Sequence, residues 1–119
     1  MKLAYAIVLA LALAAPGGAA LAHHGWSTYE PSKTTTLEAQ VQAVRYANPH
    51  VEVDVTVNGQ KWLLTLAPVS RMQTRGVTEQ MLKVGQTIKI EGKRSLDPKR
   101  FEVKVEAITV GGKTTGLRA

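Results

Sequence analysis

The sequence has 119 residues, enough for one domain but not for two, and a formal net charge of +6 at neutral pH. It contains no cysteine, which excludes a disulfide framework and argues against a tetrahedral zinc site. The basic residues are scattered, with one local group at Lys93, Arg94, Lys99 and Arg100. We interpret this charge as solvated surface, and we expect no nucleic acid partner.

The first 22 residues have the pattern of an export signal. Lys2 precedes an apolar run over residues 3–15, residues 16–18 break that run, and Ala20-Leu21-Ala22 forms a cleavage pattern of small residues. The apolar run is shorter than the roughly 20 residues that a membrane-spanning helix needs. We therefore expect cleavage after Ala22, a bacterial periplasmic location, and a mature chain of 97 residues without membrane insertion.

Residues 23–33 form a lead segment that carries two aromatic residues, Trp26 and Tyr29. From residue 34 the sequence favours β-structure, because apolar and polar residues alternate as far as Ala43. Val44 and Tyr46 break this alternation, which predicts a bulge or bend near the end of the first strand.

A β-hairpin is predicted next. Residues 51–57 alternate four valines with three polar residues, and residues 60–66 return with Trp62, Leu64 and Leu66 on one side. Asn58-Gly59 between them is a strong hairpin signal, because both residues tolerate positive φ.

The remaining elements are a helical insertion and two further strands. Pro68 suits a helix start and Gly76 a helix end, and residues 78–82 indicate a second short turn. Residues 87–92 and 100–110 alternate as strands, and residues 111–119 are predicted to be a flexible tail.

Five strands with a helix between the third and fourth predict a mainly β protein. We expect a small five-stranded OB-like barrel over residues 34–110, with one short helical insertion between strands three and four. A short open β-sandwich is the alternative, although barrel closure would remove the exposed edges of a flat sheet.

Two motifs carry a family resemblance: His23-His24-Gly25-Trp26-Ser27, and the segment Tyr46-Ala47-Asn48-Pro49-His50-Val51. With Trp62, Arg75-Gly76-Val77 and the strand from Lys83 to Gly92, the chain resembles small exported bacterial proteins classified as a domain of unknown function. The Arg-to-Gly spacing is one residue shorter here than in that pattern. The resemblance covers nearly all of the mature chain and implies export and fold, but no activity.

The chain has three histidines, His23, His24 and His50, and all lie in these two motifs. Cleavage after Ala22 would make His23 the N-terminus, so its amine and ring could chelate Cu(II), with further imidazoles completing a tetragonal set. The sequence therefore predicts a copper site at His23, His24 and His50 in a periplasmic binding protein. The alternative for His24 is a surface hydrogen bond, and the alternative for His50, which follows Asn48-Pro49, is a role in ordering a turn.

The second hypothesis is a metal-free module that binds an envelope protein, a glycan or a small ligand. Its candidate ligand-binding residues are Trp26, Tyr46, Asn48 and Trp62. No catalytic constellation is recognisable, because Ser27 and Ser70 have no evident histidine–acid partners. We therefore expect a binding protein and not an enzyme.

Overall fold

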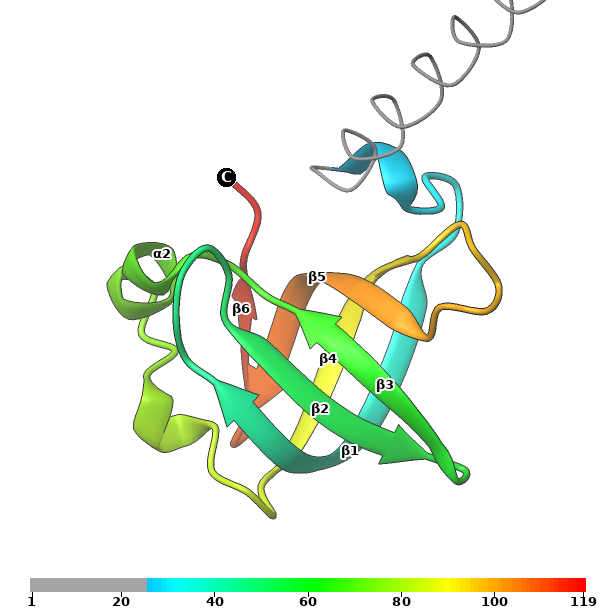
Figure 1. Ribbon diagram of the computed structural model, residues 1–119. Coiled ribbons are helices and arrows are strands. Elements are labelled where there is room, and N and C mark those ends of the chain that lie inside the picture. Colours follow the sequence, from blue (N-terminus) through cyan, green and yellow to red (C-terminus); the bar gives the residue numbers. More distant parts are fainter. Residues whose placement is uncertain (1–25) are drawn as a thin grey trace, which may run out of the picture.

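A computed structural model describes residues 26–119, so the predicted signal peptide and the segment with His23 and His24 lie outside the described residues. The described chain forms a closed β-barrel with a short helix between its third and fourth strands (Figure 1). None of the helices among residues 26–119 is long and apolar enough to cross a membrane.

The barrel consists of β1 (Thr35–Arg45), β2 (Glu52–Val57), β3 (Gln60–Thr65), β4 (Thr87–Arg94) and β5 (Glu102–Val110). Neighbouring strands pair antiparallel in the order β3-β2-β1-β4-β5. The parallel pairing of β3 with β5 closes the barrel. This arrangement confirms the predicted OB-like barrel and excludes the open sandwich.

Strand β1 belongs to both halves of the barrel because it bends. Its first half, Thr35–Gln40, pairs with β4, and its second half pairs with β2 from Val41 onward. The register shifts between Val41 and Ala43, so the predicted bulge is confirmed at Gln42.

The hairpin of β2 and β3 is also confirmed. Asn58 and Gly59 both have positive φ, 50° and 78°, as a two-residue hairpin turn requires. Val53, Val55 and Leu64 are buried in the barrel core. On the opposite face of β2, Asp54 is buried as well, because the guanidinium of Arg45 covers it and donates two hydrogen bonds of 2.9 and 3.0 Å.

The helical insertion consists of α2 (Val69–Thr74) and the short 3-10 helix η4 (Glu79–Met81). Both lie beside the barrel in Figure 1. Met72, Val77 and Leu82 are fully buried and belong to the same core cluster as the strand residues. The insertion is therefore part of the domain's core.

The C-terminal residues differ from the predicted flexible tail. Lys113–Gly116 form a sixth strand, β6, along β5, and Leu117 is only 2 % exposed. Arg71 and Arg75 also hold this segment, since each donates to its main-chain carbonyls. The prediction fails because a single buried leucine gives no periodic signal in the sequence.

The lead segment contains the 3-10 helix η3 (Trp26–Thr28) and then crosses to the barrel at Tyr29. Tyr29 forms an isolated bridge with Ser95, and its phenolic hydroxyl donates to the carboxylate of Glu102 on β5. Burial, then the hydrogen bond to Glu102 and the charge of that carboxylate, raise the pKa of Tyr29 above its usual value. These contacts fix residues 29–30 against β4 and β5.

Candidate functional site

Tyr46 and Asn48 hold the loop between β1 and β2 against the helical insertion. The Tyr46 hydroxyl donates to the Val77 carbonyl at 2.6 Å, and the Asn48 side-chain oxygen accepts from the Val69 amide at 3.1 Å. Burial raises the pKa of Tyr46. Both residues, proposed from the sequence as ligand-binding, therefore have anchoring contacts that place His50 beside α2.

The structure does not gather the other predicted ligand-binding residues around this loop. Trp62 on β3 is 9 % exposed and belongs to the core cluster. Trp26 is in η3, at the lead-segment end of the described chain. The copper prediction also needs His23 and His24, which lie outside the described residues.

His50 itself borders a cavity of about 240 Å³ between the β1–β2 loop, α2, β5 and the C-terminal segment. The lining combines an apolar floor with cationic side chains, and its residues are His50, Leu66, Pro68, Arg71, Lys104, Val105, Leu117, Arg118 and Ala119. Among residues 26–119, no aspartate or glutamate lines it. We refer to this space as the His50 cavity.

Burial, and after it the nearby cations, shift the pKa values of two lining residues, His50 and Lys104. Burial, then Lys104, then Arg71 lower the pKa of His50, and only Glu52 opposes this change. Burial, then the charge of Arg71, lower the pKa of Lys104, and the charge of Glu102 opposes this change. Lys104 and Arg71 therefore each disfavour a positive charge on His50, and Arg71 disfavours the charge of Lys104.

The arginines of the cavity differ in their partners. Arg118 forms an ion pair with Glu106 at 3.0 Å. Arg71 donates to the carbonyl of Leu117 at 3.2 Å, and the residues that the structure describes give it no carboxylate partner. The charge of Arg71 therefore has no direct neutralising contact within residues 26–119.

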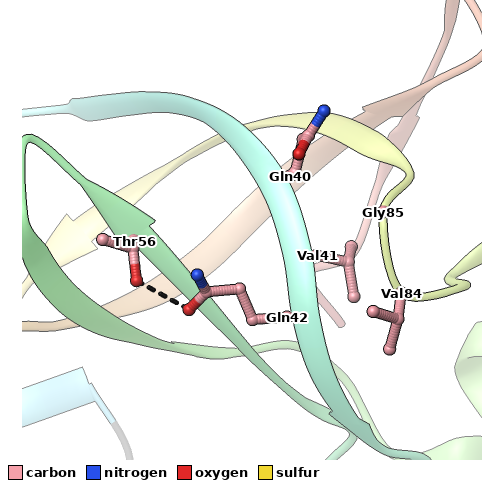
Figure 2. A pocket seen from close by; sticks show the side chains of 6 residues that line it. All are labelled: Gln40, Val41, Gln42, Thr56, Val84 and Gly85. Carbon is pink, nitrogen blue, oxygen red and sulfur yellow. Dashed lines mark hydrogen bonds between the residues drawn. The ribbon is translucent and has the colours of Figure 1, made fainter.

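A larger hollow of about 510 Å³ lies at the β1 bulge, and its described lining residues carry no charged side chain. Figure 2 shows its lining residues, Gln40, Val41, Gln42, Thr56, Val84 and Gly85. The Thr56 hydroxyl donates to the Gln42 side chain at 2.6 Å, and Gln40 points away from this pair. Its polar groups do not converge on one point, so the smaller His50 cavity is the stronger candidate.

The described residues contain no group of three or more histidine, cysteine, aspartate or glutamate side chains that could hold a metal ion. The lowered pKa keeps the His50 ring neutral near pH 7, as a metal ligand requires. Arg71 and Lys104, however, would repel a divalent cation bound there.

Sequence reasoning found His50 but missed the three residues that give the cavity its charge. Arg71 lies in the insertion, Lys104 on the outer face of β5 and Arg118 in the C-terminal segment. The alternation of residues 101–105 does indicate that Lys104 faces away from the core. No local pattern indicates that these three residues meet.

Fold and site together define a small OB-like barrel with a cationic cavity next to its first loop. The chain belongs to the family of unknown function DUF6152, whose model matches residues 10–104. His50, Arg71 and Lys104 lie within the matched residues, and Arg118 follows them. No curated protein matches the chain.

Proposed function

We propose that the protein is an exported binding module of the bacterial cell envelope that holds a small anion in the His50 cavity. Export rests on the signal-like residues 1–22, and the anion on the electrostatics of the cavity. The observation that carries the proposal is the convergence of Arg71, Lys104 and Arg118 on one space, whose lining within the described part of the chain includes no acidic side chain.

Folding has brought Arg71 and Lys104 together at an electrostatic cost, since each is half-buried near the other. An anion in the cavity would remove this cost and accept charge-assisted hydrogen bonds, which are stronger than neutral ones. Arg71 and Lys104 are not interchangeable. The guanidinium of Arg71 presents a planar set of N–H donors, whereas the ammonium of Lys104 is a compact point charge.

We expect the mature protein to bind sulfate, and substitution of Arg71→Gln or Lys104→Met to weaken that binding roughly 10- to 100-fold. Each substitution removes a charged donor from the cavity. Isothermal titration calorimetry on the mature chain measures the affinities. Lys89→Met is the matched control, because Lys89 is exposed on β4 and away from the cavity.

The same titration should depend on pH through His50. Because the pKa of His50 lies below its usual value, the ring gains its charge only as pH falls through that lowered pKa. Sulfate affinity should therefore rise as pH falls through the lowered pKa of His50, and His50→Gln should remove that rise. Equal affinity in the Arg71, Lys104 and Lys89 variants would reject the proposed function.

Copper binding is the second candidate, favoured by the two histidines His23 and His24 at the predicted mature start. We expect any Cu(II) affinity of the mature chain to come from the predicted start at His23 and His24. The cations beside His50 oppose its use as a ligand, so His50→Ala should change Cu(II) affinity less than twofold. A loss of tenfold or more, measured by competition with a chelator, would instead support the three-histidine site.

A further inference from the structure

Residues 117–119 form one wall of the His50 cavity and lie beyond the last pair of the barrel strands. That pair joins Gly116 of β6 to Ala107 of β5. The next residue, Leu117, has a buried side chain, and its amide donates to the Glu106 carbonyl at 2.8 Å. Strand pairing therefore ends before this wall.

Three consecutive carbonyl groups at the start of the wall accept hydrogen bonds from the helical insertion. Arg75 donates through Nη1 to the carbonyls of Gly116 and Arg118, at 2.9 and 2.6 Å. Arg71 donates to the carbonyl of Leu117 between them, at 3.2 Å. The two arginines are four residues apart, so they lie on the same side of α2, beside the C-terminal segment (Figure 1). We refer to these contacts as the α2 clamp.

Arg75 differs from Arg71 because it is not among the residues that line the cavity. Its side chain donates to the two carbonyls, and within residues 26–119 it forms no ion pair. The two carbonyls lie on either side of Leu117, which lines the cavity together with Arg118. Arg75 therefore reaches the cavity only through its wall.

We propose that Arg75 is a positioning residue of the anion site, which holds Leu117 and Arg118 in the cavity wall without contacting the ligand. Arg71 lines the cavity as well as bonding the wall, so a wall held by Arg71 alone would depend on the same group that meets the anion. A site is precise only when such supporting contacts fix the residues that line it. This inference rests on the proposed function, although the α2 clamp itself can be measured without a ligand.

The first measurement is hydrogen exchange of the Leu117 amide in the ligand-free mature protein, followed by NMR. Arg75→Met removes both bonds from Arg75, and we expect the protection of this amide to fall about threefold to tenfold. Lys113→Met is the matched control, because Lys113 is exposed on β6 of the same segment and does not line the cavity. Unchanged protection in Arg75→Met would overturn the α2 clamp.

The second measurement is the Kd for sulfate from an NMR titration, which reports on folded molecules alone and is not altered by an unfolded fraction. We expect Arg75→Met to weaken sulfate binding about threefold. Arg75→Lys keeps a charged donor at this position and should return both the Kd and the Leu117 protection to within about twofold of the original protein. Lys113→Met should leave the Kd unchanged, although it also removes a positive charge from this region.

The outcomes separate this inference from the proposed function. Sulfate binding by the original protein with the same Kd in Arg75→Met would overturn the positioning role and leave the anion site intact. An equal loss in Lys113→Met would assign the effect to charge and would also overturn it. A folded original protein that does not bind sulfate would reject the proposed function and the positioning role together, whatever the exchange of Leu117 shows.

Discussion

Replacement of Gly92 by alanine is expected to destabilise the barrel by at least about 3 kcal/mol, the upper end of ordinary overpacking. A Cβ atom at residue 92 would lie 2.1 Å from the carbonyl oxygen of Lys104 and 2.9 Å from its carbonyl carbon. Both atoms are backbone, so β4 and β5 would have to separate. The free energy of unfolding in urea measures the effect.

Gly116→Ala is the matched control, because a Cβ atom there would contact nothing within 4 Å. We expect it to change the free energy of unfolding by less than about 1 kcal/mol. A similarly small loss in Gly92→Ala would contradict the prediction and show that β5 can move away from β4. Because the clash is with Lys104 itself, any folded fraction of Gly92→Ala should also bind sulfate more weakly.

For Gly92, the sequence indicates the strand in which it lies but not the backbone contact that requires a glycine there. The strand pattern from Lys83 to Gly92 is visible in the sequence, and its final glycine is part of the family resemblance. The physical reason for that glycine is a backbone contact with a residue 12 positions later. The pairing shifts register between Glu91 and Gly92, and such long-range geometry leaves no local signal.

The fold was predictable because its strongest signals are local. The alternation of Val51, Val53 and Val55 defines the buried face of β2, and Asn58-Gly59 defines its turn. The order of strands and helix then selects the barrel, since few topologies join these elements without leaving open edges.

The candidate site was only partly predictable because its residues come from distant parts of the sequence and meet only in the folded chain. His50 was a candidate through its residue type, but Arg71 resembles any basic residue on a short helix. Lys104 resembles any exposed lysine on a strand until α2 and the C-terminal segment are placed over it. Leu117, which forms part of the cavity wall, was missed with the β6 segment before it.

Trp62→Ala is expected to destabilise the protein by about 3–5 kcal/mol, the usual cost of removing a buried tryptophan side chain. The Trp62 ring is 9 % exposed and meets Phe101 edge-on, with ring centroids 5.2 Å apart. The guanidinium of Arg94 lies 4.9 Å from the centre of the Trp62 ring. Removal of the indole would leave a cavity and take away the ring under this cation.

Trp62→Phe separates this packing role from the ligand-binding role that the sequence predicted. A smaller ring still fills most of the space, so we expect a loss of less than about 1.5 kcal/mol in urea unfolding. Sulfate affinity should be unchanged in this variant, because Trp62 does not line the His50 cavity. A stable Trp62→Phe protein that no longer binds sulfate would assign the ligand to the tryptophan side of the barrel instead. The two locations make different demands on the structure. Arg94 covers the Trp62 ring, so a ligand could reach the face of that ring only if Arg94 rearranged.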